Sequence, residues 1–232
     1  ISQVALVGGG SNPQPGEISL AHNGVLFLDE LPEFTRNTME VLRQPIENGT
    51  ITISRAACAL TYPCSVMLIC AMNPCPCGFL DDNKKKCTCS EFQINRYRAK
   101  LSGPLLDRID IQIDVPRLTQ EELLKIDESA ESSAQIRERV VKARKIQQER
   151  YKNLPIFSNS ELNAKLIKQF CVLSTDCESL LKTAITKFNL SGRSYDRILK
   201  LSRTIADLDN SANIETKHIL EAIQYRNLDR QN

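Results

Sequence analysis

An acidic pair directly follows an apolar run near the start of the chain. Residues 25–28 read Val-Leu-Phe-Leu, and Asp29 and Glu30 come next. Such a run predicts a parallel strand buried on both faces, and ligands of parallel sheets sit at the carboxyl ends of the strands. At that edge Asp29 would hold the Mg²⁺ shell of a nucleotide, and Glu30 would activate the attacking water. The pair indicates the acidic half of a nucleoside-triphosphate site; the alternative is an acid pair that only caps a following helix.

A polar residue also ends a second apolar run. Residues 65–72 predict another buried strand, and Asn73 follows it. Its amide would orient the water or sense the γ-phosphate. Two polar strand ends at one edge of a sheet favour the catalytic interpretation of the acidic pair.

The glycines at 8–10 do not form a phosphate-binding loop. That loop reads G-x-x-x-x-G-K-[ST], with the Lys reaching the β- and γ-phosphates. Here Ser-Asn-Pro follows the glycines, and the motif occurs nowhere in the 232 residues. We read these glycines as flexible loop and expect negligible ATPase activity from this chain alone, as for a fragment that lacks the phosphate-gripping half of its site.

Four of the nine cysteines form two close pairs. Cys75 and Cys77 are separated from Cys87 and Cys89 by a short polar loop. Four thiolates brought together in this way bind Zn²⁺ tetrahedrally and staple a segment that has no core of its own. The spacing C-x-C is less common than C-x₂-C, so free thiols or an oxidised pair are the alternatives to structural zinc.

The elements that would position these residues alternate between strand and helix. Thr35 is a plausible N-cap of a helix that stops near Gly49. Residues 50–64 predict a β-hairpin with its tip at 55–57, and 92–100 predict a helix. The alternation of Ile109, Ile111, Ile113 and Val115 predicts a further strand, so the fold class is a layered α/β sheet.

Beyond Pro116 no strand pattern occurs. Helices are expected at 134–151, 161–170, 177–188, 193–208 and 216–226. We therefore expect an α/β core over 1–117, a linker over 118–133 and an all-helical domain over 134–232.

Composition sets the broad class. The formal net charge of +2 gives no case for nucleic acid by itself, and the 41% hydrophobic content is that of an ordinary globular protein. No apolar run approaches the ~20 residues of a membrane span, so no membrane partner is expected. An odd number of cysteines without an export signal fits a reducing cytoplasm.

Four longer motifs carry a resemblance to a known family. They are residues 15–24, which lead into the acidic pair, and residues 42–47, 71–78 and 101–110. Together they resemble the magnesium-chelatase-like AAA+ ATPases of the ComM/YifB type over essentially the whole chain. The resemblance implies the C-terminal part of an AAA+ P-loop core with an inserted hairpin, followed by an all-α lid.

The resemblance also assigns roles. It implies that residues 25–30 are the Walker B motif, that Asn73 is sensor 1, and that Arg108 is an arginine finger for a neighbouring subunit. Arg193 matches sensor 2, with Arg197 as the rival position. For Arg108 the alternative is a surface salt bridge with Asp107 or Asp110. For Arg193 and Arg197 it is an ordinary solvated helix charge.

Two hairpins match the family as well. Residues 50–64 are similar to its pre-sensor-1 hairpin, and residues 8–20 to its insertion in helix 2. Such hairpins line a central pore in related ring motors, so Arg55 near the tip is a candidate phosphate contact. The alternative is a hairpin that packs on its own subunit.

Two functions from different classes follow from the resemblance. The first is a Mg²⁺- and ATP-dependent subunit of a self-assembled ring, a hexamer when intact, that moves DNA in helicase or branch-migration reactions. The second is a chelatase-like or chaperone-like ATPase that remodels a protein partner.

Overall fold

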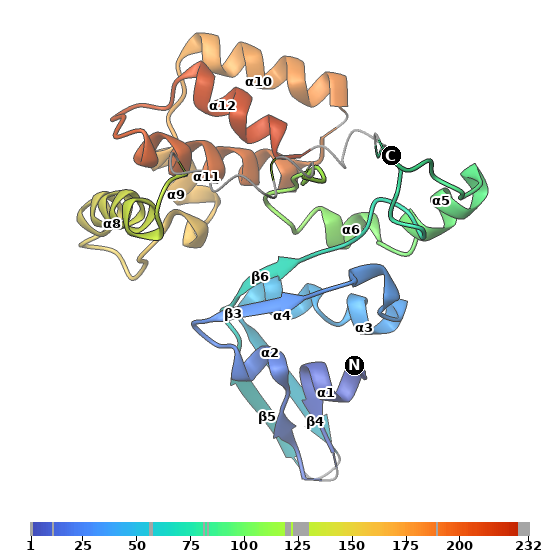
Figure 1. Ribbon diagram of the computed structural model, residues 1–232. Coiled ribbons are helices and arrows are strands. Elements are labelled where there is room, and N and C mark those ends of the chain that lie inside the picture. Colours follow the sequence, from blue (N-terminus) through green and yellow to red (C-terminus); the bar gives the residue numbers. More distant parts are fainter. Residues whose placement is uncertain are drawn as a thin grey trace. The chain divides into compact units, whose positions relative to one another are not determined.

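The computed structural model describes residues 2–10, 12–55, 58–80, 82, 84–118, 122, 130–188 and 190–226. By its internal contacts the chain divides into two compact units, residues 1–109 and 110–232 (Figure 1). Each unit is described by itself. The first contains every named strand, and the second is built from helices.

Two parallel strands form the central sheet of the first unit. Strand β3 (Val25–Leu28) pairs with β6 (Met67–Cys70), with Val25 opposite Met67 and Leu28 opposite Cys70. Leu26 and Leu28 are buried, whereas Val25 and Phe27 are 55% and 58% exposed. The prediction that this strand is buried on both faces was therefore wrong for this chain: one face packs on the core, and the other is open.

Two antiparallel hairpins accompany this sheet. Strands β4 (Thr50–Arg55) and β5 (Cys58–Pro63) pair from Thr50 opposite Pro63 to Arg55 opposite Cys58, which confirms the hairpin predicted over 50–64. A shorter hairpin joins β1 (Gly8–Gly9) to β2 (Gln14–Pro15).

The glycines of the short hairpin have a structural reason. Gly8 has φ +98°, and a Cβ there would lie 2.4 Å from the Gln14 carbonyl oxygen. A Cβ on Gly16 would lie 2.3 Å from the Gly8 nitrogen. Because the two backbone segments meet this closely, only glycine fits, and Gly8–Gly9 is paired strand rather than the flexible loop expected.

Short helices complete the first unit. They are α1 (Gln3–Val7), α2 (Glu17–Leu20), the 3₁₀ turn η1 (Leu31–Glu33), α3 (Arg36–Glu40), α4 (Arg43–Asn48), α5 (Glu91–Arg98) and α6 (Gly103–Leu106). Thr35 caps α3 by accepting from the Thr38 N–H, and Gly49 ends α4 in the left-handed region, as predicted for the two ends of this segment. The single helix expected between them is instead two short helices, α3 and α4. Helix α1 was not predicted, because its five residues are too few to show a helical period.

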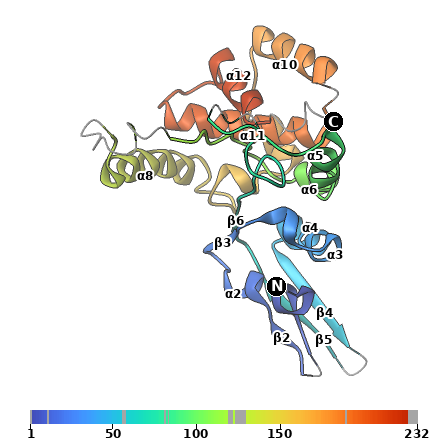
Figure 2. The same cartoon turned by 45° about the vertical axis from the view of Figure 1, so that its right-hand side comes forward.

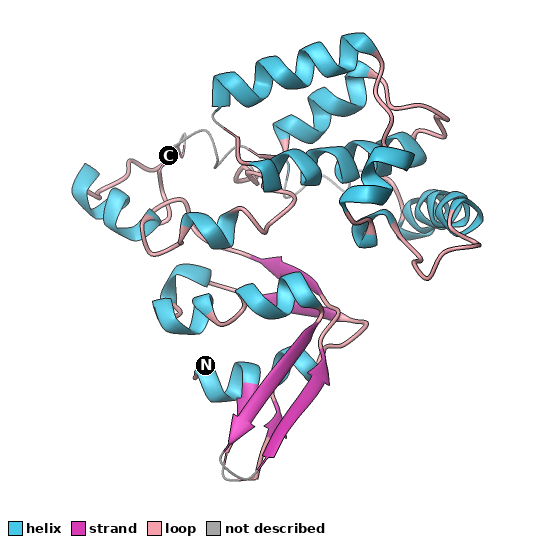
Figure 3. Cartoon of the chain, turned by 180° about the vertical axis from the view of Figure 1, so that it is seen from behind, coloured by secondary structure: helices cyan, strands magenta, loops and turns pink. Residues whose placement is uncertain are grey.

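The described part of the second unit is drawn as helices joined by loops (Figure 3), and these helices pack around one apolar cluster. Its elements are α8 (Ser133–Arg150), η2 (Asn159–Glu161), α9 (Ala164–Phe170), α10 (Thr175–Phe188), α11 (Gly192–Leu208) and α12 (Thr216–Gln224). Ile198, Ile219 and Ala222 are fully buried in that cluster. The helical periods from residue 134 onward therefore predicted real helices.

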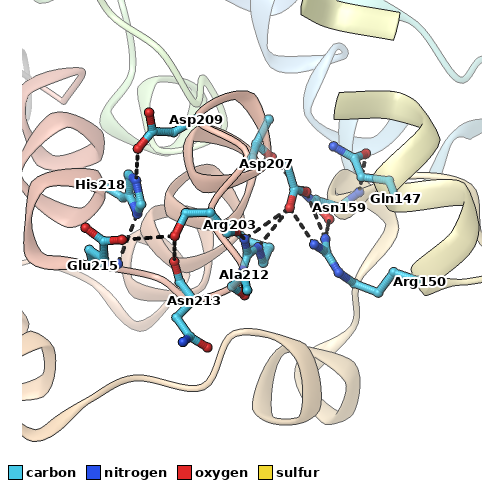
Figure 4. A network of polar contacts seen from close by, with 12 residues as sticks. Gln147, Arg150, Asn159, Arg203, Asp207, Asp209, Ala212, Asn213, Glu215 and His218 are labelled. Atoms are coloured by element: carbon cyan, nitrogen blue, oxygen red, sulfur yellow. Dashed lines mark hydrogen bonds and ion pairs between the residues drawn. The ribbon is translucent and has the colours of Figure 1, made fainter. Parts of the chain in front are cut away.

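A buried polar network crosses the second unit (Figure 4). The Asp207 carboxylate, fully buried, accepts from Arg150, from Arg203 and from the Asn159 amide. Arg203 also donates to the Ser211 and Ala212 carbonyls. The two guanidinium groups share the one carboxylate, and Arg203 has two carbonyl acceptors besides, so the network ties α8, η2 and α11 together with each of its charged groups hydrogen-bonded.

The strand predicted over 109–115 does not form among the described residues. The segment makes only an isolated bridge from Gln112 to Arg226, and Ile113 and Val115 are 64% and 83% exposed. The prediction rested only on the alternation of apolar and polar residues. It fails because no neighbouring strand among the described residues covers the apolar side chains of this segment. Of the linker expected over 118–133, residues 119–121 and 123–129 lie outside the part of the chain that the structure describes.

Candidate nucleotide-hydrolysis edge and four-cysteine cluster

The acidic pair lies beside the end of the neighbouring strand. The Ala71 N–H donates to the Leu28 carbonyl over 2.9 Å, and the Leu31 N–H donates to the Ala71 carbonyl over 3.0 Å. These bonds bracket Asp29 and Glu30 and extend the parallel ladder past both strands. The carboxyl ends of β3 and β6 are thereby brought together, with Asn73 two residues beyond Ala71.

The backbone at the acidic pair is tightly held. Glu30 has φ 51° and ψ 46°, in the left-handed region, and its N–H donates to Asp29 Oδ1 over 2.8 Å. A residue other than glycine is strained in this region of backbone conformation, so the surrounding hydrogen bonds must hold it there. Asp29, Glu30 and Asn73 are all exposed, so their polar groups are available to a ligand at this edge.

Tyr97 is a neighbour of this edge that sequence reasoning missed. Burial raises the pKa of its hydroxyl, and the carboxylates of Glu33 and Glu30 raise it further, whereas a hydrogen bond with the Asn73 backbone lowers it. Tyr97 stands on α5 and is buried. It links the segment after β6 to the helix that follows the cysteine insertion, and no pattern in the sequence signals that contact.

The four predicted cysteines do come together. The Sγ atoms of Cys75, Cys77, Cys87 and Cys89 all lie within 4.8 Å of one another. The Sγ–Sγ distance is 3.4 Å from Cys75 to Cys77, 3.7 Å from Cys75 to Cys87 and 3.5 Å from Cys77 to Cys87. Four sulfurs at ~2.3 Å from a tetrahedral Zn²⁺ lie about 3.8 Å apart, so the cluster fits this ion.

The surroundings of the cluster favour a thiolate at one of its cysteines. Backbone N–H groups of Thr88 and Phe79 lower the pKa of Cys77 to about 5. The Cys89 N–H donates to Cys87 Sγ over 3.4 Å, but burial and the neighbouring thiols raise the pKa of Cys87 to about 12, and burial raises the pKa of Cys89. Since the thiolate is the form that binds metal, Cys77 is the cysteine best set to bind first, and the support for a four-sulfur site comes from the distances among the four Sγ atoms.

The turn inside the insertion is fixed by a glycine. Gly78 has φ +78°, and its N–H donates to the Cys75 carbonyl over 3.0 Å. Cys75 is fully buried and lies two residues beyond Asn73. An ion held by Cys75 would therefore anchor the segment that carries Asn73.

The Arg108 side chain is buried rather than exposed at the surface. Its Nη2 lies 2.6 Å from Glu47 Oε1, and its Nη1 donates to the Pro104 carbonyl. The ion-pair partner is thus Glu47 of α4, whereas the sequence had offered Asp107 or Asp110. A role for Arg108 at a neighbouring subunit requires it to leave this pair.

The remaining predicted arginines lie in different settings. Arg193 is exposed in the first turn of α11, whose N-cap is Ser191. Arg197, one turn on, forms an ion pair with Asp110. Arg55 ends β4, but its side chain and the hairpin tip at 56–57 lie outside what the structure describes.

Comparison with known families identifies the class. The model for magnesium chelatase subunit ChlI matches residues 1–123, and the model for the C-terminal part of the same subunit matches residues 130–226. The first match covers the acidic edge of the sheet, and the second covers most of the helical unit. The chain belongs to the magnesium chelatase subunit ChlI family, a family of AAA+-type ATPases.

Two curated relatives are similar over nearly the whole chain. Competence protein ComM of Haemophilus influenzae is 49% identical over 97% of the chain, and the uncharacterized protein YifB of Escherichia coli is 46% identical over 99%. These comparisons confirm the resemblance to the ComM/YifB type. The chain spans less than half of these relatives, 43% and 44% of their lengths. Among the described residues no helix is long and apolar enough to cross a membrane.

Proposed function

We propose that the chain contributes the hydrolytic edge and the lid of an ATPase that works on DNA in a ring of identical subunits. The observation that carries the proposal is the acidic pair Asp29–Glu30, held beside Asn73 at the carboxyl ends of two parallel strands. In this proposal Asp29 holds the water shell of Mg²⁺, Glu30 activates the attacking water, and Asn73 orients it.

The sites of two subunits complete each other in this proposal. Arg108 leaves Glu47 and reaches the γ-phosphate bound by the neighbouring subunit, where an always-charged guanidinium stabilises charge in the transition state. Residues 134–232 form the lid, with Arg193 as sensor 2. Arg197 is the weaker candidate, because Asp110 already engages it.

The four cysteines have a structural rather than a catalytic role in this proposal. A Zn²⁺ ion held by Cys75, Cys77, Cys87 and Cys89 neutralises the thiolates and fixes the segment that begins at Asn73. Their mutual distances support zinc over free thiols. The hairpin β4–β5 carries Arg55 toward DNA phosphates.

DNA is favoured as the substrate by similarity to a competence protein and by the resemblance to the ComM/YifB type. The second candidate is remodelling of a protein partner, as the name of the magnesium chelatase family invites. The test is ATP turnover by the intact protein with and without branched or single-stranded DNA. Stimulation by DNA supports the proposal, whereas stimulation only by a protein partner overturns it in favour of the second candidate.

A further inference from the structure

Helix α8 carries an excess of positive charge. Its 18 residues include six Lys or Arg side chains and two Glu side chains. Figure 2 shows the helix lengthwise at the margin of the helical unit. Among the residues that the structure describes, the buried positions of α8 are Ala143 and Gln147 in its second half, whereas residues 133–142 are all exposed.

Half of the cations of α8 are already neutralised. Arg139 pairs with Glu131, Lys142 with Glu138, and Arg150 with Asp207. The second Glu of the helix, Glu149, pairs with Lys152. Both carboxylates of α8 are therefore occupied.

The other three cations have no such partner. Arg137, Arg144 and Lys145 are exposed and make no ion pair with any residue that the structure describes. We call these three side chains the cationic face of α8. Their charge is not cancelled locally, so it contributes to the potential that an approaching anion meets.

Helical geometry places these residues on one side. Arg137 and Arg144 are seven residues apart, so they lie almost in line and about 10 Å apart along the axis. Val141, which is 44% exposed, lies between them on the same side, and Gln148 lies beyond Arg144. Lys145 borders this side, and the buried positions Ala143 and Gln147 point away from it.

The chemistry of this face fits a row of phosphates. Guanidinium groups bind phosphate oxygens through paired N–H donors, and cations about 10 Å apart on one side of a helix can contact separate phosphates of a nucleic-acid backbone. A membrane-surface helix needs a broad apolar face with aromatic or Leu side chains, and α8 has neither. A protein interface needs a central aromatic or apolar anchor, and this face offers only Val141.

We propose that the cationic face of α8 binds the phosphate backbone of a nucleic acid. The proposal rests on the proposed DNA substrate and adds a contact in the helical unit to that of Arg55. Because the contact is electrostatic, it is independent of base sequence and weakens as salt rises.

The test compares two triple variants of the full chain with equal loss of charge. R137Q/R144Q/K145Q removes the cationic face, and R139Q/K142Q/K152Q removes three cations that are already ion-paired. Gln keeps a helix propensity close to those of Lys and Arg, and circular dichroism checks that the helix content is unchanged. Binding of a fluorescent single-stranded oligonucleotide is measured by anisotropy without ATP over a series of salt concentrations.

For the first variant we expect affinity to fall about ten-fold or more and the slope of log K against log salt to become shallower by about 2. The paired-cation control should bind within about two-fold of the parent chain. Equal losses in both variants, an unchanged first variant, or no binding by the parent would overturn the proposal.

Two further measurements separate rival partners. If loss of the cationic face abolishes sedimentation with phosphatidylserine vesicles, or alters self-association, while oligonucleotide binding persists, the face serves a membrane or a second copy and the proposal is wrong. Because ATP is absent from the binding assay, the two proposals fail separately. If the intact protein shows no ATPase activity while the chain still binds the oligonucleotide through this face, the proposed function is overturned and this inference stands.

Discussion

Asp29 and Glu30 illustrate what residue type and position alone convey. Their chemistry is local, because two carboxylates after an apolar strand suit Mg²⁺ and water. The structure adds the left-handed backbone conformation of Glu30. The partners of Arg108 and Tyr97 are distant in sequence. Glu47 and the Asn73 backbone were therefore not predictable from spacing, because only the fold brings them near.

Asp207 joins three elements of the helical unit, since it accepts from Arg150, Arg203 and Asn159. Replacing it with Ala leaves Arg150 and Arg203 without their carboxylate, and removal of one partner of a buried pair costs about 3–5 kcal/mol. Urea unfolding of the variant should show this loss. Glu149→Gln, which breaks the exposed pair with Lys152, should cost less than about 1 kcal/mol. Equal small effects would show that the network in Figure 4 contributes little.

Tyr97 gives a residue-level prediction for the site itself. Tyr97→Phe removes the hydroxyl that meets the Asn73 backbone, so we expect kcat for ATP in the intact protein to fall several-fold with KM and zinc content unchanged. Tyr62→Phe is the matched control, since it loses a hydroxyl bond to the Pro13 carbonyl in the hairpins. A variant of Tyr97 that matches the Tyr62 control in kcat would exclude a positioning role.

At the scale of elements, helices were predicted better than strands. The helices of the second unit show a 3.6-residue period around a shared core, and that period is visible without tertiary contacts. Strands need neighbours: residues 109–115 alternate as a strand should, yet only Gln112 makes a bridge. The open side of β3, with Val25 and Phe27 exposed, likewise depends on what lies next to the strand and not on its own sequence.

The cysteine insertion yields a prediction for an element. Protein purified under reducing conditions should contain about one Zn²⁺ per chain, and Cys77→Ser or Cys87→Ser should lose the ion and lower the free energy of unfolding. Cys70→Ser is the control, because Cys70 is a free thiol of β6 outside the cluster. A metal content near zero in the parent protein would contradict a zinc site.

For the whole molecule, the two units carry complementary parts of the proposed cycle. The first holds the hydrolytic edge, and the second holds Arg193 and the cationic face of α8. The contact boundary between Ile109 and Asp110 precedes the linker expected over 118–133, and the two family matches meet between residues 123 and 130. We propose that motion of the second unit with nucleotide state couples hydrolysis to movement of DNA.

The most direct test of the central claim is ATP turnover by the intact protein carrying Glu30→Gln or Glu33→Gln. Both variants replace an exposed carboxylate, but only Glu30 follows β3 directly beside the end of β6. Loss of a catalytic base lowers turnover about 10²- to 10⁴-fold, so Glu30→Gln should fall by that amount while still binding ATP. Glu33→Gln, which loses only its pair with Lys100, should remain near the parent rate. Turnover by Glu30→Gln equal to that of Glu33→Gln would contradict the assignment of this edge as the site of hydrolysis.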